Sequence, residues 1–118
     1  MQHLVDRLAA AARLDKERAE RAARIVLGML EREAPAEALD RLFAAMDGAR
    51  EAARLDGEGS VSGGFGAMSA FNALTAAGLS VREVQAVTRE FVAFAREKAG
   101  PEVVDQITRA VPGLPALS

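Results

Sequence analysis

The stretch LSVREVQAVTREFVAFAREKAGPEVVDQITRAVPG, residues 79–113, decides the fold. Its Ser80 and Glu83 predict a capping box, in which the serine accepts from the third helical amide and the glutamate reaches back to the serine amide. Gly100-Pro101 predicts the end of one helix and the start of the next, because glycine suits a helix C-terminus and proline a first turn. The apolar residues between these signals recur at helical spacing, at Val84, Val87, Phe91, Phe94 and Ala95, and then at Val103, Val104, Ile107 and Val111.

The same pattern occurs 65 residues earlier without a gap. The matched positions are Leu14 with Leu79, Glu37 with Glu102, Asp40 with Asp105, Ala45 with Ala110 and Gly48 with Gly113. We therefore predict an all-α fold, a helical bundle of two pseudo-repeated three-helix units in one domain, 1–118. Repeat one spans 2–55, a linker spans 56–66 and repeat two spans 67–118. Such units cannot close their own cores, so we expect their apolar faces to pack against each other.

Local signals place the helices within each repeat. In the first repeat we predict a helix over about 2–13, a second capped by Asp15, a third begun by Pro35 and ended by Gly48, and a short continuation over 49–55. In the second repeat, the first helix ends at Gly78. The segment between them, DGEGSVSGGFG, is rich in glycine and serine, a composition typical of a flexible linker.

Composition excludes several classes of function. The net charge is −2 and neither half is polarised, which argues against general nucleic-acid binding, since that requires a basic face. There is no cysteine, hence no disulfide framework or thiolate chemistry. No apolar run approaches the length of a membrane span, and Met1-Gln2-His3 does not begin a signal peptide. We expect a cytoplasmic protein, and the abundance of alanine and arginine suggests a GC-rich bacterial genome.

No residue set predicts catalysis. The glycine-rich segment has neither the lysine nor the preceding strand of a phosphate-binding loop, so we interpret it as a plain linker. His3 is the only imidazole and lies near a terminus, whereas metal and acid–base sites draw on converging side chains. No nucleophile–base pair exists. We therefore predict no enzyme activity, no catalytic residue, no cofactor and no metal site.

Two groups of side chains remain as candidate binding sites. A basic cluster near the start of the second helix is either an anion or nucleic-acid contact or a solvated face interleaved with Glu17 and Glu20. We favour the solvated face, because phosphate binding relies on uncompensated cations. The cluster consists of Arg13, Lys16, Arg18, Arg21 and Arg24.

The second group is apolar and is either ordinary core, a pocket for an apolar ligand or a partner-binding face. Methionine and phenylalanine at helical spacing occur mostly in cores, but they also form adaptable binding surfaces. The group consists of Phe65, Met68, Phe71, Leu74, Phe91 and Phe94.

Segments of both halves carry a family resemblance. The residues FAREKAG (94–100), Val103-Val104 and AVPG (110–113), together with IVLGML (25–30) and Met46-Asp47-Gly48, resemble small bacterial helical proteins of unknown function, the VcgC/VcgE-like group. Members carry Pro-Gly after the third helix, where this chain has Asp47-Gly48. The resemblance implies an all-helical bacterial protein and supplies no catalytic residues.

These observations favour a non-enzymatic interaction or scaffold protein that self-associates, since an alanine-rich chain this short has more apolar helix surface than a monomer hides. The partner is then a second copy or another protein. The alternative is a protein that binds a hydrophobic small molecule or lipid in a cavity between the two repeats. A third possibility, DNA binding through Arg18, Arg21 and Arg24, is disfavoured by the charge balance.

Overall fold

Seven α-helices and no strand occur in the residues that this computed structural model describes, 2–46, 48–56, 67–111 and 113–114. The predicted all-α class is therefore confirmed. The short continuation expected after Gly48 is a separate helix, α4. The helices are α1 (Gln2–Ala12), α2 (Lys16–Glu33), α3 (Ala36–Ala45), α4 (Ala49–Asp56), α5 (Ala67–Ala76), α6 (Val81–Ala99) and α7 (Pro101–Ala110).

The predicted caps begin both long helices, and the predicted Gly100 ends α6. Asp15 accepts a hydrogen bond from the Arg18 amide at 2.8 Å and so begins α2. At the start of α6, the Glu83 amide donates to Ser80 Oγ at 3.2 Å and the Ser80 amide donates to Glu83 Oε1 at 2.7 Å, which confirms the capping box. Gly100, at φ 94°, ends α6, and α7 follows directly from it.

Corresponding helices start at a constant interval. α1 and α5 begin at residues 2 and 67, α2 and α6 at 16 and 81, and α3 and α7 at 36 and 101, so each pair starts 65 residues apart. The turns after α3 and α7 also match, because Gly48 and Gly113 have φ values of 80° and 84°. α4 has no counterpart among the described residues, since only Leu114 is described after Gly113.

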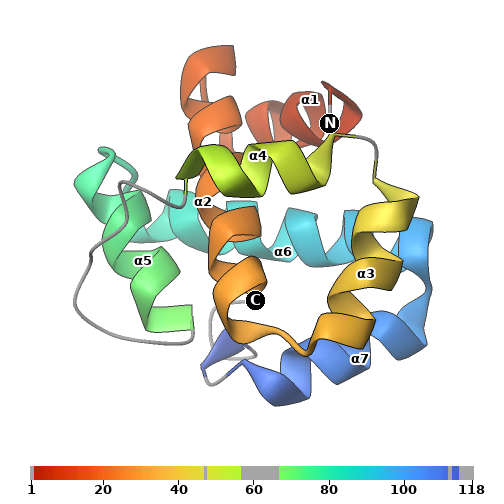
Figure 1. The fold of residues 1–118 in the computed structure, drawn as a ribbon. Helices are drawn as coiled ribbons and strands as arrows, with labels where there is room; N and C mark the ends of the chain where they lie inside the picture. Colours follow the sequence, from red (N-terminus) through yellow and green to blue (C-terminus); the bar gives the residue numbers. More distant parts are fainter. Residues whose placement is uncertain (1, 47, 57–66, 112, 115–118) are drawn as a thin grey trace.

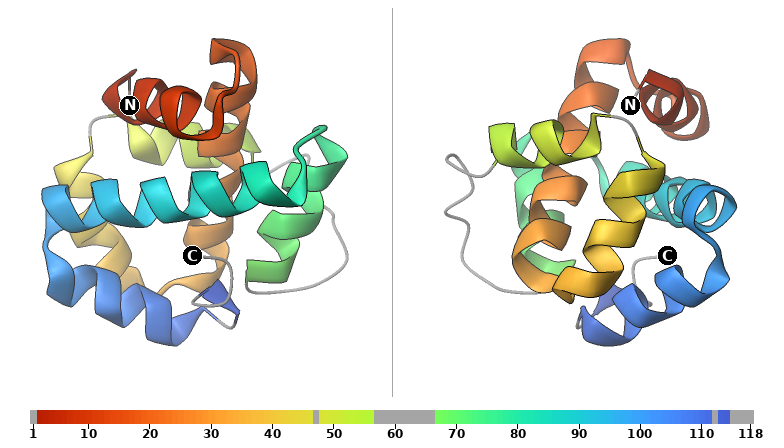
Figure 2. Two further views of the ribbon diagram at one scale, coloured as in Figure 1. Left: turned by 180° about the vertical axis from the view of Figure 1, so that it is seen from behind. Right: turned by 45° about the vertical axis from the view of Figure 1, so that its right-hand side comes forward.

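α2 runs through the centre of the molecule, between α4 on one side and α6 on the other (Figure 1). α1 packs on both α2 and α6, and α5 packs on the same two helices further along. α3 and α7 pack against each other and against α6. Seen from behind, α6 lies at the surface, and no described helix crosses its outer side (Figure 2).

The two long helices are therefore buried to different extents. α2 is buried all the way round between residues 25 and 30, including Gly28. α6 buries one stripe, and its outer side is half-buried or exposed. The buried residues of α6 are Val84, Val87, Thr88, Phe91, Phe94 and Ala95, as the spacing predicted, with Thr88 in addition.

A single copy of the chain buries nearly all of its described apolar stripes. The described large hydrophobic side chains that stay exposed are Met68 in α5, at 56%, and Val81 at the start of α6, at 55%. The predicted linker, 56–66, lies outside the described residues apart from Asp56, the last residue of α4. None of the described helices combines the length and apolar character needed to cross a bilayer.

Candidate functional site

The structure separates the six apolar candidate residues into two environments. Met68 is exposed and Phe71 is half-buried, one turn apart on α5, whereas Leu74, Phe91 and Phe94 are buried in the core. Phe65 lies outside the described residues. The described members of the group therefore do not form one continuous surface, and α5 alone presents an exposed part of it.

A small apolar cavity lies where α2, α3, α6 and α7 meet. Its volume is about 20 Å³, and Val26, Leu42, Phe91 and Ile107 are among its lining residues. Thr88 also lines it, but the hydroxyl donates to the Val84 carbonyl of its own helix at 2.9 Å and is satisfied there. Pockets for small molecules usually measure about 300–1,000 Å³, so this space is an interior void rather than a formed ligand site. Of the five apolar candidates that the structure describes, only Phe91 is among its lining residues.

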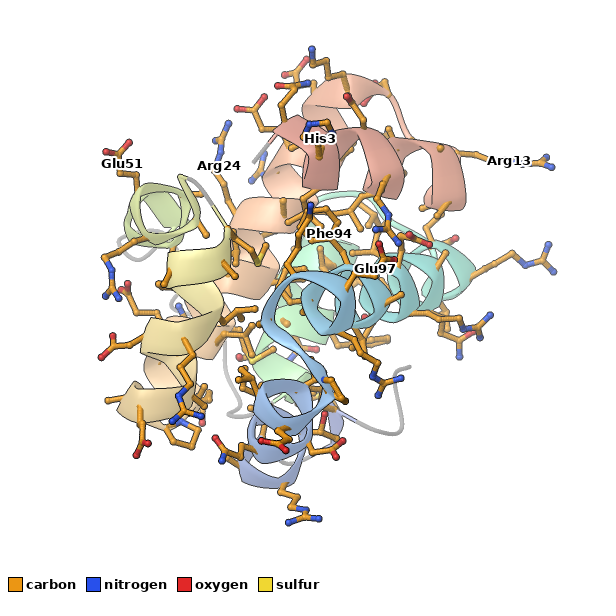
Figure 3. All side chains as sticks on the ribbon, turned by 90° about the vertical axis from the view of Figure 1, so that its right-hand side faces the viewer. His3, Arg13, Arg24, Glu51, Phe94 and Glu97 are labelled. Carbon is orange, nitrogen blue, oxygen red and sulfur yellow. The ribbon has the colours of Figure 1, made fainter. Side chains whose placement is uncertain are left out.

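A polar cluster joins α1 to α6. Arg7 Nε donates to Glu90 Oε2 at 2.7 Å, and Arg7 also pairs with Glu97 at 2.9 Å. Its guanidinium lies over the Phe94 ring, 5.1 Å from the centroid, and the Lys98 ammonium lies 5.6 Å from the same centroid. Figure 3 shows Phe94 and Glu97 on the side of α6 that lies beneath α1.

In this α1–α6 cluster, one arginine of α1 holds two carboxylates of α6. Hydrogen bonds to Glu97 and Glu90 raise the pKa of Arg7 above its already high usual value, so the arginine stays charged. A permanently charged guanidinium cannot exchange protons with a substrate at neutral pH. The cluster therefore ties two helices together and holds both carboxylates on the α1 side of α6.

The residues of the basic cluster near the start of α2 differ in whether they form ion pairs. Arg24 pairs with Glu20 at 2.5 Å, one turn away, as the solvated-face interpretation expects for that pair. Arg13, Lys16 and Arg21 are exposed and make no ion pair with described residues. Arg13 projects away from the molecule at the end of α1, far from the Arg24 side chain in the same view (Figure 3). Arg13 and Arg24 therefore do not converge on a common point.

Sequence reasoning missed a second set of arginines, on the outer side of α6. Arg82, Arg89 and Arg96 are exposed and form no ion pair within the described residues. The signal is present in the sequence as the dipeptide Arg-Glu, which occurs at 82–83, 89–90 and 96–97. Residues seven apart lie on one side of a helix, so this spacing predicts one row of arginines beside one row of glutamates.

The remaining candidates do not assemble a reactive centre in the described part of the chain. His3 lies exposed on α1 (Figure 3). No group of three histidine, aspartate or glutamate side chains able to hold a metal ion occurs among the described residues. Most of the glycine-rich segment is outside them. The chain has no significant match to a protein-family model, a curated protein or a solved structure.

Proposed function

We propose that this protein is a non-enzymatic interaction or scaffold protein, which acts by binding other proteins on its helix surfaces. The observation that carries the proposal is the unequal covering of its two long helices. α4 packs on the outer side of α2, whereas the outer side of α6 has no covering helix in the described structure. A rigid helical frame with one uncovered long helix offers a preformed surface to a partner, which lowers the ordering cost of binding.

The proposal includes the duplication expected from the sequence. In this view the units 2–55 and 67–118 derive from one three-helix unit, joined by 56–66. The constant interval of 65 residues between matching helix starts supports it, as do the matching φ values of Gly48 and Gly113. The proposed setting is the bacterial cytoplasm. Membership of the VcgC/VcgE-like group is proposed on the sequence resemblance alone.

We propose that the chain self-associates through α5. Met68 is the most exposed large hydrophobic side chain described, and Phe71 lies beside it on the next turn of α5. Methionine adapts its shape to a partner and is enriched at interfaces. In the proposed dimer, α5 of one copy contacts α5 of the other, which is the usual self-complementary arrangement of a two-fold dimer.

The mass of the native protein tests self-association. We expect a dimer by light scattering over a wide concentration range, and a dimer mass with no bound molecule in a native mass spectrum. Met68→Glu places a charge in the proposed contact and is expected to give a monomer. Val81→Glu, an equally exposed apolar residue on another helix, is the matched control and should leave the dimer intact. A monomer at every concentration for the natural chain would remove self-association from the proposal.

The second candidate function is binding of a hydrophobic small molecule or lipid. The apolar cavity between α2, α3, α6 and α7 favours it, because it lies where the two proposed units meet. At about 20 Å³ it must widen to admit such a ligand. An environment-sensitive apolar dye should then bind the native protein saturably, and Phe91→Ala should change the affinity. Equal affinity of the two proteins would place the dye elsewhere.

A further inference from the structure

The outer side of α6 carries a straight row of uncompensated positive charge. Arg82, Arg89 and Arg96 are exposed and seven residues apart, so their attachment points are spaced at about 10 Å along the helix. None forms an ion pair within the described residues. We call these three residues the arginine row.

The glutamates next to the arginine row are engaged elsewhere. Glu83 accepts from the Ser80 amide in the capping box, and Glu90 and Glu97 are held by Arg7 on the α1 side. All three carboxylates lie one residue after an arginine, about 100° further round the helix. The fold thus sorts the charges of α6 into a satisfied acidic row facing α1 and an unsatisfied basic row facing outward.

Small side chains lie beside the arginine row. Ala86 and Ala93 are half-buried beside the row, and neither projects far enough to hold another helix away. Ala86 also packs partly against the core. A helix packing there meets two alanines along its centre and three arginines along its edge. Interaxial distance depends on the side chains at the contact, so alanines permit a close approach.

The molecule already contains one contact of this kind. α4 packs on α2 with Ala49, Ala52 and Ala53 buried. Gly28 of α2 is also buried, and helical spacing puts it on the other side of the helix from Val26 and Leu30, which line the cavity. Gly28 precedes Ala93 by the 65-residue interval that separates the matching helix starts. The side of α6 that corresponds to the α4-covered side of α2 is therefore the side that carries the arginine row.

We propose that the outer side of α6 binds an amphipathic helix of a partner protein, with alanine on its contacting side and carboxylates along one edge. The alanines pack over Ala86 and Ala93 as α4 packs on α2, and the carboxylates pair with the arginine row. Arginine forms bidentate pairs with carboxylates, which fixes the register of the bound helix. This inference rests on the proposed class of interaction protein and not on self-association.

The charge distribution favours an acidic helix over a nucleic acid. The arginine row is one helix side wide, and the glutamate row lies beside it. Nucleic-acid surfaces are broad and basic, whereas this chain carries a net charge of −2. A single helix with carboxylates at seven-residue spacing matches both the width and the interval of the row.

The test uses the full chain and a defined probe. The probe is a lactam-stapled helical peptide of about five turns, with alanine along one side and glutamate at seven-residue intervals beside it. Binding is measured by calorimetry at low and at physiological salt. We expect saturable one-to-one binding that weakens steeply with salt. A peptide with glutamine in place of each glutamate should bind at least ten-fold more weakly.

The variants locate the site. The triple variant Arg82→Gln, Arg89→Gln and Arg96→Gln should lose at least ten-fold in affinity for the acidic peptide. Its matched control changes the charge equally on other helices, by Lys16→Gln, Arg21→Gln and Arg109→Gln, and should bind like the natural chain. All six positions are exposed, and circular dichroism checks that both variants keep their helix content.

Three results would overturn the proposal. One is equal loss of affinity in both triple variants, which would indicate general charge attraction. Another is no binding of the acidic peptide to the natural chain. The third is row-dependent binding of duplex DNA without binding of the peptide, which would assign the row to nucleic acid. The native mass of the protein is read separately, so a failure of self-association is distinguished from each of these results.

Discussion

α2 and α6, with 18 and 19 residues, each begin at a side-chain cap, but their surroundings differ. α2 lies between α4 and α6 and is buried all round over residues 25–30, where its sequence is IVLGML. The corresponding segment of α6, residues 90–95, is EFVAFA and carries a glutamate at its first position. A helix that is covered on every side requires apolar or small residues throughout, whereas a half-covered helix keeps charges on its open side. The outer sides of α2 and α6 therefore differ in composition because α4 covers the first and no described helix covers the second.

The largest expected effect comes from filling the α2–α4 contact. Gly28→Leu adds a large side chain at a buried position of α2 and should lower the free energy of unfolding by about 2 kcal/mol or more. The same residue at the matching position, Ala93→Leu, adds volume on an open side and should change stability by less than about 0.5 kcal/mol. Urea denaturation of both variants measures the difference.

The sign of the change in stability for Gly28→Leu distinguishes close packing from an open helix side. Leucine has a higher helix propensity than glycine, so without a steric conflict the substitution would stabilise the protein by up to about 1 kcal/mol. A more stable Gly28→Leu variant would therefore show that α4 does not pack closely on this side of α2. A strongly destabilised Ala93→Leu variant would show that the outer side of α6 is covered in solution, which would contradict the open surface on which the proposed function rests.

The next prediction compares the stability of the turns that follow α1 and α5. Both helices are followed by a residue with positive φ, which is Arg13 at 56° in the first half and Gly78 at 100° in the second. Gly78→Ala should lower the free energy of unfolding by about 1–2 kcal/mol, because residues other than glycine are strained at positive φ. The added Cβ would meet Arg18 at an ordinary contact distance of 3.7 Å, so the cost comes from the backbone.

Arg13→Gly is the reciprocal change. It removes the strained side chain at an exposed position that makes no described ion pair, and should raise the free energy of unfolding by about 0.5–1 kcal/mol. Thermal unfolding of the two single variants and of the double variant measures both effects. An unchanged or lower melting temperature for Arg13→Gly would mean that this turn is not strained in the first half.

The sequence was sufficient to predict the all-α class and most helix positions, because the signals that define them are local. The caps at Asp15 and Ser80 and the turn at Gly100-Pro101 act through hydrogen bonds and backbone angles of neighbouring residues. The side-by-side placement of α4 and α2 is a long-range contact with no cap or turn to mark it. The sequence therefore indicated a short helix at 49–55 but not which helix it covers.

The candidate site was harder to predict, since exposure and pairing depend on neighbouring helices. Met68 and Leu74 share a helix and an apolar character, yet one is exposed and the other buried. Arg7 and Glu90 are 83 positions apart, and only the packing of α1 on α6 brings them together. The arginine row is different, because its seven-residue spacing is visible in the sequence. Its lack of ion pairs within the described residues depends on tertiary packing, because Glu90 and Glu97 bind Arg7 of α1 instead.

The last prediction compares the ion pairs of Arg7 and Arg41, and the smallest expected change in stability is that of Arg41→Gln. Arg7 is 30% exposed, holds two glutamates of another helix and lies over Phe94, so Arg7→Gln should lower the free energy of unfolding by about 1 kcal/mol. Arg41 is 56% exposed and pairs at 3.4 Å with Glu37 of its own helix. Arg41→Gln should therefore cost no more than about 0.3 kcal/mol.

Salt and pH separate the two variants further. Because the pKa of Arg7 is raised in the folded protein, its contribution is complete below the unfolded pKa and is lost only as strongly alkaline pH passes the folded value. The deficit of Arg7→Gln should thus stay constant from neutral to moderately alkaline pH, while added salt should erase the small effect of Arg41→Gln first. Urea denaturation at several salt concentrations tests this order. Equal deficits for the two variants would mean that Arg7 behaves as an ordinary surface charge and that α1 is held on α6 by apolar packing alone.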